Sequence, residues 1–396
     1  TDLEHVKQDL GDFPLILVND SVKALQQLAV AQRQRFAGPV IAITGSTGKT
    51  TTKDMLTAIL RQKGEVLSTQ GNYNNELGLP LTILSLQPGH HALVTEMGMR
   101  GLGEIDFLAV IARPTYGIIT NIGHTHQEIL GSQEKIAQAK AELISHIPVH
   151  GAMALNKADK QLLAPWLSNL RCPVKWFNTD PPADIWAEDA KLNQWSGYDY
   201  KICSSEGKFK VSLPIPGRHN ILNSLAPAAI ARFLGLSWTE ICQGLSQVNL
   251  SAMRLETVEI PPAKGWTVIN DAYNANPDSM CAALEVLGTI AGGRRAIAVL
   301  GDMYELGDYA SQGHRLVGQK AKSEEIAYLI TVGQLAGEIA KGAQEAGFPS
   351  ERIRSCQNNE EAVSYLKEIL QPDDVILLKG SRGVRMEEIM EGLQTL

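Results

Sequence analysis

Cysteine is scarce in this sequence of 396 residues. Its cysteines are odd in number and form no CxxC pair, and neighbouring ones lie about 30 or more residues apart. A fold held by disulfides needs a dense, even set of cysteines, and a zinc knuckle needs closely spaced pairs, so the pattern argues against both. The five positions are Cys172, Cys203, Cys242, Cys281 and Cys356.

Long apolar runs, massed basic residues and low-complexity tracts are also missing. No stretch approaches the ~18 uninterrupted apolar residues that a membrane span needs. The sequence starts without the charged, apolar and small-residue progression of a secretory signal. The net charge is -7, and without clusters of Lys and Arg the chain offers no surface for nucleic acid. We therefore expect a cytoplasmic protein, with no membrane span and no nucleic-acid partner, that acts on small molecules.

What the sequence does contain is the length and composition of a multidomain globular protein. It is 44% hydrophobic and 20% charged, and it is too long for one ordinary core because domains cluster at ~100–200 residues. From PVIAITG at 39–45 onward, β-branched apolar runs alternate with amphipathic helices, which is typical of a parallel α/β sheet. A polar interlude at 178–210 predicts an antiparallel excursion. A second α/β series starts after SAMRLE at 251–256, so we place a domain boundary near residue 252.

The predicted strands matter because open α/β sheets bind ligands at the carboxyl ends of their strands. Upstream of both series, PLILV at 14–18 predicts a further strand, followed by an Asn19 or Asp20 cap and a helix over 21–36. The main predicted strands lie at 39–43, 92–98 and 116–123 in the first series, and near 266–271, 295–302, 327–333 and 374–380 in the second.

A phosphate-binding loop is predicted directly after the strand at 39–43, where TGSTGKTTT opens a helix at 51–62. Glycines let successive backbone N–H groups turn toward a phosphate, Lys49 can reach the β- and γ-phosphates, and Thr50 can ligate magnesium. The glycines are more closely spaced than usual, so the loop is a shortened variant. A plain Gly/Ser turn is the alternative, but strand, loop, GKT and helix occur together in the required order. The predicted nucleotide-binding residues here are Gly45, Ser46, Thr47, Gly48, Lys49, Thr50 and Thr51.

Two further strand ends carry side chains that suit a metal ion. Glu96 ends the strand in ALVTEMG, where a carboxylate can hold the magnesium bound to phosphates. His124 and His126 end the next strand in NIGHTH. Because these ends and the phosphate loop should share one edge of the sheet, we expect the side chains to lie together. The alternatives are a solvated glutamate and structural or surface histidines.

A series of motifs runs along the chain in a fixed order. It comprises GSTGKTTT, GNYNNELGLPLT at 71–82, TEMG, NIGHTH, AKAE at 139–142, PGRHNILN at 216–223, DAYNANPDSM at 271–280, GDMYELG at 301–307 and KGSRG at 379–383. Together these motifs resemble the Mur ligases, and within that family the branch that adds D-alanyl-D-alanine to UDP-N-acetylmuramoyl-tripeptide in peptidoglycan precursor synthesis. GKT alone is unspecific, whereas the YNANP, GDMxELG and KGSR series is specific to this branch. The resemblance runs from the PLILV segment to the C-terminus.

The resemblance implies an α/β protein with a P-loop-type, mostly parallel central ATPase domain and a Rossmann-like C-terminal domain. ATP would phosphorylate a substrate carboxylate, and an amine would attack the acyl phosphate to form an amide, ADP and phosphate. This branch carries a further N-terminal domain for the UDP-sugar. We expect 1–37 to be the remnant of that domain and a linker, 38–252 the central ATP-binding domain and 253–396 the C-terminal domain, in a monomer.

The resemblance also assigns roles in phosphoryl transfer. Lys49 and magnesium would neutralise charge on the transferring group, which is mainly an electrostatic and positioning task. Thr50 and Glu96 would hold one magnesium ion, with His126 helping a second. His124 is then the bystander of the two histidines.

Further residues are assigned to the nucleotide and the other substrates. Asn220 would contact adenine, while Arg254 and Asp271 would reach the nucleotide across the cleft, which implies domain closure. Arg382 offers a two-pronged grip on a carboxylate. The residues assigned to the dipeptide or the acceptor peptide are Asn74, Asn75, Asn274, Lys379, Ser381 and Arg382.

Some of these assignments have structural alternatives. Asn220 could cap a helix over 221–233. Asn276 could be an N-cap with Pro277 at the first helical position. The KGSRG segment could be a capped helix with exposed charges.

Lys140 is expected to carry a carbamate formed from carbon dioxide. It interrupts the apolar face of a helix predicted over 132–146. Partial burial disfavours the ammonium, lowers the pKa and supplies the neutral amine that carbon dioxide must meet. The resemblance of AKAE to the family motif points to the same residue, and the anionic product would help to position magnesium beside Glu96 and His126. The alternative is a lysine whose stem covers the core and whose amine reaches water.

Two other functions fit parts of the pattern. A folylpolyglutamate-synthase-like ligase shares the ATPase and C-terminal domains and lacks the UDP-sugar domain, but YNANP and KGSR fit the dipeptide-adding branch better. A non-catalytic nucleotide-binding regulatory protein would keep the phosphate loop without ligase turnover. A nicotinamide enzyme is excluded because GMRGLGE at 98–104 lacks the G-x-G-x-x-G order.

Overall fold

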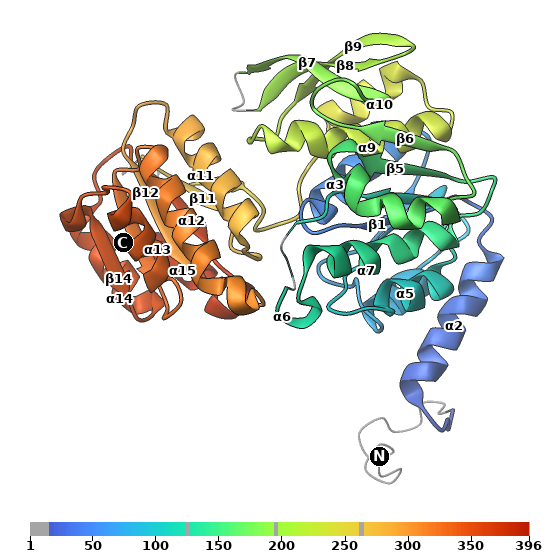
Figure 1. The fold of residues 1–396 in the computed structure, drawn as a ribbon, viewed down its shortest axis with the longest axis horizontal. Coiled ribbons are helices and arrows are strands. Elements are labelled where there is room, and N and C mark those ends of the chain that lie inside the picture. The colour runs from blue at the N-terminus through green and yellow to red at the C-terminus, as the bar shows by residue number, and fades with distance from the viewer. Residues whose placement is uncertain (1–15, 124, 126, 194–196, 261–264, 396) are drawn as a thin grey trace.

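The chain forms two separate sheets, one of nine strands and one of six (Figure 1). We call the two parts the nine-stranded unit, which ends at Leu250, and the six-stranded unit, which begins at Leu255. A short linker connects them. The computed structural model describes residues 16–123, 125, 127–193, 197–260 and 265–395.

The larger sheet is parallel over most of its width. Its strands are β1 (Val40–Thr44), β2 (Val66–Ser68), β3 (Ala92–Glu96), β4 (Tyr116–Ile119), β5 (Ala152–Asn156), β6 (Val174–Phe177), β7 (Ile185–Leu192), β8 (Tyr198–Ser204) and β9 (Gly207–Leu213). Their order is β2-β3-β1-β4-β5-β6-β7-β8-β9. β1 lies between β3 and β4, and its register pairs Ile43 with Glu96 and Thr44 with Ile119. The carboxyl ends of these three strands therefore lie side by side, as the sequence predicted.

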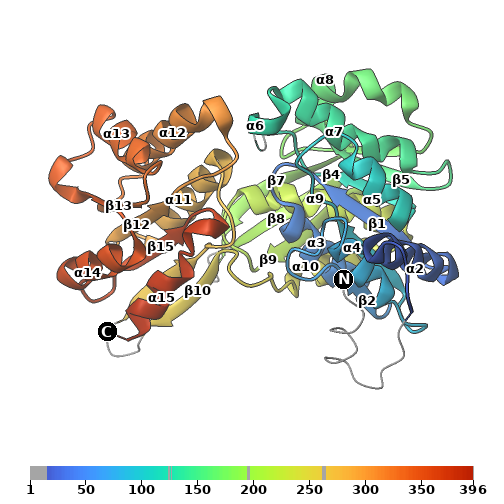
Figure 2. The ribbon, with the colours of Figure 1, turned by 90° about the horizontal axis from the view of Figure 1, so that it is seen from below.

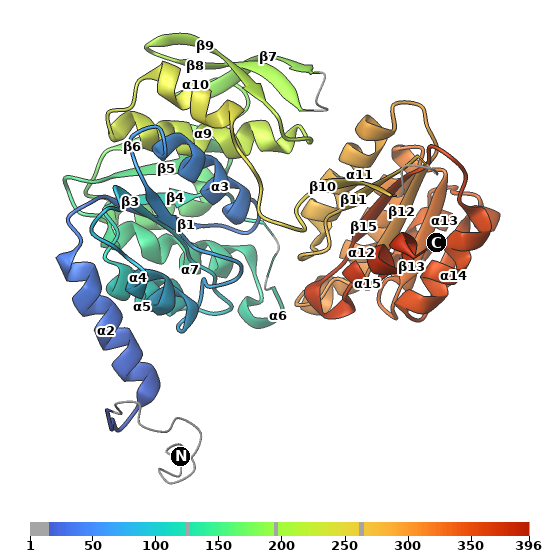
Figure 3. The ribbon, with the colours of Figure 1, turned by 180° about the vertical axis from the view of Figure 1, so that it is seen from behind.

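Helices cover both faces of this sheet (Figures 1 and 3). They are α2 (Ser21–Arg35), α3 (Lys49–Leu60), α4 (Gly78–Leu84), α5 (Glu104–Ala112), α6 (Gln127–Leu130), α7 (Gln133–His146), α8 (Lys160–Leu163), α9 (His219–Phe233) and α10 (Trp238–Ser246), with 3-10 turns η1 (Lys157–Asp159) and η2 (Ala164–Asn169). In β1, Ile41 and Ile43 belong to the core under α3, α9 and α10, whereas Val40 and Ala42 belong to the core under α4, α5 and α7. Burial on both faces explains why β1 is apolar almost throughout.

The polar interlude at 178–210 forms the antiparallel part of the sheet, as predicted. β7, β8 and β9 pair antiparallel to one another, while β6 meets β7 in parallel. α10 packs on this part, and the Phe209 and Trp238 rings stack with their centroids 4.5 Å apart. Aromatic stacking of this kind joins a half-buried hairpin to its helix.

The six-stranded unit is a second α/β layer structure. Its strands are β10 (Glu256–Ile260), β11 (Trp266–Asn270), β12 (Ala296–Gly301), β13 (Tyr328–Val332), β14 (Ile353–Cys356) and β15 (Val375–Lys379). Its helices are α11 (Pro277–Ala291), α12 (Ala310–Ser323), α13 (Gly337–Glu345), α14 (Asn359–Ile369) and α15 (Glu387–Gln394), with 3-10 turns η3 (Gly307–Tyr309), η4 (Ser350–Arg352) and η5 (Arg382–Val384). The sheet order is β10-β11-β15-β12-β13-β14, and only β10 pairs antiparallel to its neighbour among these strands.

Two cores flank this sheet. α11, α12 and α13 contribute to one, and α14 and α15 to the other (Figure 2). The prediction of an α/β protein with two mostly parallel sheets is therefore confirmed. None of the helices in the described ranges is long and apolar enough to span a membrane.

The strand predicted at 14–18 is wrong in its described part. Residues 16–18 form no strand, and the side chains of Ile16, Leu17 and Val18 are 88%, 77% and 42% exposed. A strand needs a neighbour for its backbone hydrogen bonds, and an apolar sequence cannot supply one. The helix that follows is α2, and Asp20 caps it by accepting from the Lys23 backbone N–H, as predicted.

Candidate active site

A cavity of about 1050 Å³ lies between the two units and is lined by both. From the nine-stranded unit it is lined by the predicted residues 45–51, Asn74, Asn75, Glu96 and Lys140. From the linker and the six-stranded unit it is lined by Arg254, Asp271, Asn274, Lys379, Ser381 and Arg382. The structure thus brings predicted residues from distant parts of the sequence to one place.

The loop between β1 and α3 has the geometry of an anion site. Gly45 has a φ of 149° and Gly48 a φ of 76°. A Cβ atom on Gly45 would lie 1.8 Å from Thr120 Oγ1, and one on Gly48 would lie 2.4 Å from Asn223 Oδ1, so side chains at either position would not fit. α3 begins at Lys49, and no side chain caps its N-terminus. Its first backbone N–H groups therefore remain free for the oxygens of a phosphate.

Asn121, which the sequence analysis did not select, braces this loop from the end of β4. Its carbonyl accepts from the Ser46 N–H at 3.0 Å, and its Oδ1 accepts from the Thr47 N–H at 2.9 Å. Its Nδ2 also donates to Thr47 Oγ1 at 2.6 Å. These three hydrogen bonds fix the backbone of the loop at Ser46 and Thr47. The signal was the pair of polar residues Thr120 and Asn121, which interrupt the apolar run that the sequence analysis extended to residue 123.

Lys49 lies folded over its own loop. Its Nζ donates to the Gly45 carbonyl at 2.8 Å and to the Ser46 carbonyl at 3.4 Å. Burial lowers the pKa of Lys49, while the nearby Glu96 carboxylate opposes that shift. The ammonium is thus placed within reach of any anion that binds the loop.

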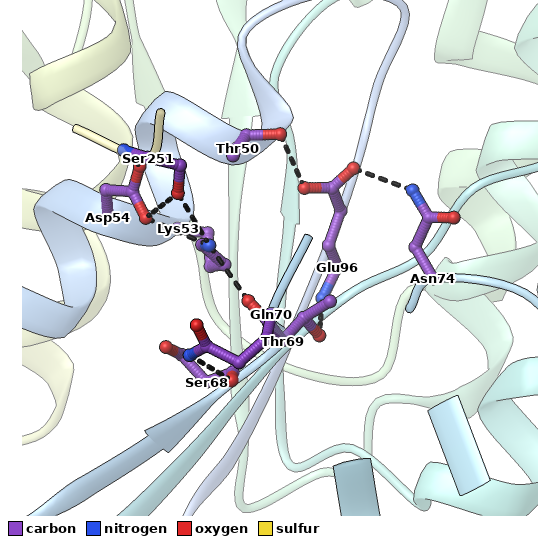
Figure 4. Close-up of polar contacts among 9 residues, drawn as sticks. All are labelled: Thr50, Lys53, Asp54, Ser68, Thr69, Gln70, Asn74, Glu96 and Ser251. Atoms are coloured by element: carbon purple, nitrogen blue, oxygen red, sulfur yellow. Dashed lines mark hydrogen bonds and ion pairs between the residues drawn. The ribbon is translucent and has the colours of Figure 1, made fainter. Parts of the chain in front are cut away.

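Glu96 is the centre of a buried polar group (Figure 4). Its side chain accepts from Thr50 Oγ1 at 2.7 Å and from Asn74 Nδ2 at 2.8 Å, and its backbone N–H donates to Thr69 Oγ1 at 3.0 Å. Carboxylate and hydroxyl oxygens are the ligands that magnesium prefers, and magnesium usually takes only one or two carboxylates beside phosphates and waters. No group of three or more His, Cys, Asp or Glu side chains suited to a metal occurs in the described ranges. The donor set at Glu96 and Thr50 fits magnesium bound together with a phosphate.

The predicted residues His124 and His126 lie outside the described residues. Thr125, between them, is buried and lines the cavity. The role assigned to His126 therefore stays a prediction.

Lys140 lies on the buried face of α7, as predicted. It is 1% exposed, yet it lines the cavity. Burial lowers its pKa well below the usual value, Lys49 adds to the lowering, and Asp159 opposes it. Burial also raises the pKa of Asp159 to about 6, although the Ile122 N–H donates to it at 3.0 Å. The cavity wall therefore holds an amine that loses its proton readily.

Asn220, which was assigned to adenine, lies behind the cavity wall. It is 1% exposed, its Nδ2 donates to the Pro216 carbonyl at 2.7 Å, and its Oδ1 accepts from Asn223 Nδ2 at 2.9 Å. Asn223 lines the cavity, and sequence reasoning missed it. α9 begins at His219 with Arg218 at the cap position, so the alternative in which Asn220 caps the helix is wrong. The chain is already helical at residue 219, and the Asn220 side chain turns back to the preceding loop.

Lys379 and Asp271 form a buried ion pair at the carboxyl edge of the smaller sheet. Lys379 Nζ lies 2.6 Å from Asp271 Oδ2 and also donates to the Asn274 carbonyl at 2.9 Å. The side chains of the pair are 3% and 14% exposed. The pair fixes the loop that carries Asn274 against the end of β15.

Arg254 and Ser381 also line the cavity. The Arg254 guanidinium lies over the Tyr273 ring, 4.3 Å from its centroid. Ser381 Oγ accepts from the Tyr304 backbone N–H at 2.9 Å, which ties the KGSRG loop to the GDMYELG loop. Tyr304 and Glu305 both line the cavity, but the sequence analysis used that motif only for its resemblance.

The structural alternative for Asn276 is confirmed. Asn276 caps α11 by accepting from the Ser279 backbone N–H, and the Ser279 hydroxyl accepts from the Asn276 N–H in return. Pro277 occupies the first helical position. A proline fits there because its missing N–H would have no partner within the helix.

Known proteins match the chain along almost its whole length. Residues 43–231 match the Mur ligase middle domain, and residues 253–382 match the Mur ligase, glutamate ligase domain. The UDP-N-acetylmuramoyl-tripeptide–D-alanyl-D-alanine ligase of Bacillus subtilis (strain 168) is 38% identical over 379 residues, which cover 96% of this chain and 81% of that protein. The chain belongs to the Mur ligase family.

Solved Mur ligase structures share the arrangement described above. Crystal structure I of MurF from Acinetobacter baumannii matches with a TM-score of 0.85 at 31% identity, covering 97% of this chain and 84% of that one. The MurF ligase of Thermotoga maritima, solved in complex with ADP, matches with a TM-score of 0.81 at 27% identity, covering 98% and 86%. The predicted P-loop-type ATPase fold in the larger unit is therefore confirmed.

The folate alternative has weaker support. A folylpolyglutamate synthase from Mycobacterium tuberculosis, complexed with ADP, matches with a TM-score of 0.74 and covers 98% of this chain and 97% of that one. Its identity is only 15%, so the likeness concerns the fold alone.

Proposed function

We propose that this Mur ligase joins D-alanyl-D-alanine to UDP-N-acetylmuramoyl-tripeptide in peptidoglycan precursor synthesis. It is an ATP-dependent ligase that forms ADP and phosphate. The observation that carries the proposal is the 38% identity to the UDP-N-acetylmuramoyl-tripeptide–D-alanyl-D-alanine ligase of Bacillus subtilis along 96% of the chain. A cavity shared by both units, with an anion-binding loop on one wall, supports it.

The chain supplies positioning and charge for phosphoryl transfer. The free N–H groups at the start of α3 bind phosphate oxygens. The Lys49 ammonium gives up its hydrogen bonds to the Gly45 and Ser46 carbonyls and donates to the β- and γ-phosphates. The γ-phosphoryl group passes to the acceptor carboxylate, which becomes an acyl phosphate. The dipeptide amine then attacks the acyl carbon, loses a proton and expels phosphate. Closing the cavity keeps water from the acyl phosphate.

Magnesium is the metal that the donor set fits best. Thr50 and Glu96 would hold it, and the bound metal would neutralise charge on the phosphates. Asn74 donates to Glu96 and thereby fixes the carboxylate that faces the nucleotide.

We further propose that Lys140 carries a carbamate. Its neutral amine attacks carbon dioxide, a C–N bond forms, one C=O electron pair moves to oxygen, and the amine proton passes to solvent. The lowered pKa of the buried amine supplies the reactive form, and the anionic product suits a wall that faces magnesium. We expect Lys140→Ala to lose activity and to regain part of it with added short carboxylates. Wild-type activity of Lys140→Ala without additives would refute the carbamate.

The linker and the six-stranded unit present groups for the nucleotide and the dipeptide. Arg254 and Asp271 face the nucleotide, with Asp271 fixed by Lys379. Arg382 binds the dipeptide carboxylate through its planar guanidinium. Further contacts to the dipeptide and acceptor peptide come from Asn74, Asn75, Asn274, Lys379 and Ser381. Residues 38–252 act as the ATP-binding domain and 253–396 as the C-terminal ligase domain.

Product analysis tests the proposal. The chain is incubated with ATP, Mg²⁺, UDP-N-acetylmuramoyl-tripeptide and D-alanyl-D-alanine, and mass spectrometry follows the pentapeptide precursor alongside ADP. A parallel arm offers folate and glutamate. We expect the pentapeptide and ADP in equal amounts. Glutamate addition to folate in place of the pentapeptide would assign the chain to the alternative, and ATP binding without any amide product would assign it a regulatory role.

A further inference from the structure

The linker between the two units is held at each end by an aspartate. On the nine-stranded unit, Asp54 accepts from the Ser251 backbone N–H at 2.8 Å and from Ser251 Oγ at 3.1 Å. On the six-stranded unit, Asp271 accepts from the Leu255 backbone N–H at 3.2 Å. Both donors of Ser251 meet one carboxylate, so the orientation of that peptide is fixed. The span between the two anchors is residues 252–254.

Each of these aspartates is paired with a buried lysine. Lys53 Nζ lies 2.9 Å from Asp54 Oδ1, with side chains 3% and 10% exposed. The pair of Lys379 and Asp271 is buried to a similar degree. Removing such charges from water is costly, and a well-packed apolar pair of similar volume is often as stable or more so. The pairs therefore contribute geometry to the linker more than stability to the fold.

Lys53 also connects the linker to the catalytic wall (Figure 4). Its Nζ donates to the Thr69 carbonyl at 2.9 Å and to Ser251 Oγ at 3.4 Å. Thr69 Oγ1 in turn accepts from the Glu96 backbone N–H at 3.0 Å. Lys53 lies one helical turn after Lys49 on α3. The root of the linker, the helix of the phosphate loop and the strand end that bears Glu96 thus share one polar network.

The linker backbone is constrained beyond its first anchor. Met253 and Leu255 have φ values of 57° and 50°, which side-chain-bearing residues rarely adopt. The Tyr273 backbone N–H donates to the Met253 carbonyl at 3.4 Å, and Arg254 lies over the Tyr273 ring. Ala252 therefore lies between a residue fixed to one unit and residues fixed to the other, which makes it the expected pivot between the units.

We propose that Lys53 and Asp54 are positioning residues for the ligase reaction, which set the angle of closure by clamping Ser251 to the helix of the phosphate loop. The proposal rests on the function proposed above. Neither side chain lines the large cavity, so both act through Ser251 and Thr69. Without the clamp, the pivot moves away from Ala252, and Arg254 and Asp271 arrive at the nucleotide in a wider range of positions. A displacement of about 1 Å at a reacting centre can cost about 100-fold in rate.

The test compares a double variant with a matched control. Lys53→Met combined with Asp54→Leu removes both charges together, so neither charge is left buried without its ion-pair partner, and the fold should lose less stability than in a variant that removes one of them. Lys208→Met combined with Glu188→Gln removes an exposed ion pair on β7 and β9, far from the linker. For the double variant we expect kcat to fall at least about 10-fold, with nucleotide affinity within about 3-fold of wild type. The control should match the wild type in every measurement.

A second readout follows the clamp directly. Hydrogen exchange in the peptide that spans 249–255 should be faster in the double variant, because the Ser251 N–H loses its acceptor. Small-angle scattering with ADP, Mg²⁺ and the acceptor should show a broader distribution of the positions of the two units relative to each other.

Two single variants separate the carboxylate from its charge partner. Asp54→Glu keeps the carboxylate, so it should recover part of kcat. Asp54→Ala leaves Lys53 buried without its ion-pair partner and should be the least stable variant.

Two results would overturn the clamp. One is wild-type kcat with wild-type exchange at 249–255 in the double variant. The other is a fall in melting temperature and nucleotide affinity that accounts for the whole loss of kcat, because the pair would then be merely structural. If the wild type forms no pentapeptide, the proposed function fails, while hydrogen exchange and scattering still decide whether Lys53 and Asp54 hold the linker.

Discussion

Lys49 donates hydrogen bonds to two carbonyls of its own loop. Replacing Lys49 removes the positive charge that would face the phosphates, but it removes no core packing. We therefore predict that Lys49→Ala lowers ATP turnover at least about 100-fold. The melting temperature should change little. Steady-state ADP release and thermal unfolding, measured on one preparation, check both statements. Turnover close to wild type would show that the loop does not serve the phosphates in this way.

Site residues could be predicted where the neighbouring sequence marks them, and they were missed where their role depends on contacts with distant parts of the chain. Thr50 and Glu96 were found because each follows or ends an apolar strand, and the sheet order then brings them together. Lys140 was found because it interrupts an apolar helix face. Lys53 and Asn223 were missed. Beyond the adjacent Asp54, the partners of Lys53 are 16 and 198 positions away, and neither separation leaves a periodic mark in the sequence.

At the scale of the element, α10 depends on a capping box. Ser237 Oγ accepts from the Glu240 N–H, and the Glu240 carboxylate accepts from the Ser237 N–H at 2.7 Å. Ser237→Ala leaves the Glu240 N–H without its side-chain acceptor, so we predict a loss of about 1 kcal/mol in the free energy of unfolding. Denaturant unfolding measures the loss. Ligase activity should be unchanged because Ser237 does not line the cavity, and a fall in kcat would contradict this.

His314 in α12 holds the GDMYELG loop only when its ring is neutral. Its Nδ1 donates to the Ala310 carbonyl at 2.7 Å, so its Nε2 is the acceptor for the Met303 N–H at 3.0 Å. Burial lowers the pKa of His314, while Asp302 and Glu338 partly oppose the shift. The unfolded chain therefore binds the proton first as the pH falls. Stability from this group is present above about pH 6.5 and is lost below it.

We predict that His314→Gln removes this pH dependence. The difference in free energy of unfolding between wild type and variant should shrink between about pH 7.5 and about pH 5.5. Taking the difference cancels other buried groups such as Asp159, whose raised pKa acts in the opposite direction. A difference that is constant or grows toward acid pH would mean that the imidazole is not held neutral.

Local sequence patterns identify strands that are buried on both faces, but they do not show whether an apolar segment has a strand to pair with. The strands at the centre of both sheets were recognised because burial on both faces makes them apolar throughout, as in β1 and β15. The segment at 14–18 has the same composition, but no described strand pairs with residues 16–18. Strand ends were also placed too late, since β4 ends at Ile119 and the polar residues after it turn to hold the phosphate loop.

At the scale of the whole molecule, the two units have separate cores. No hydrophobic cluster among the described residues joins one sheet to the other. We predict two transitions in calorimetry of the intact chain without ligands. Because residues of both units line the cavity, we expect a non-hydrolysed ATP analogue with Mg²⁺ to raise both transitions, since it binds only the folded form. A single transition without ligands would mean that the units are coupled through polar contacts alone.

The linker of residues 252–254 also sets how often the two halves of the cavity meet. A tether this short keeps the six-stranded unit at an effective concentration of roughly millimolar or more beside its partner surface. The contact that closes the cavity can therefore be weak and still form often. A weak contact also opens quickly, which frees the products for release. A long linker with a high-affinity interface could close the cavity as often, but it would open more slowly and delay product release.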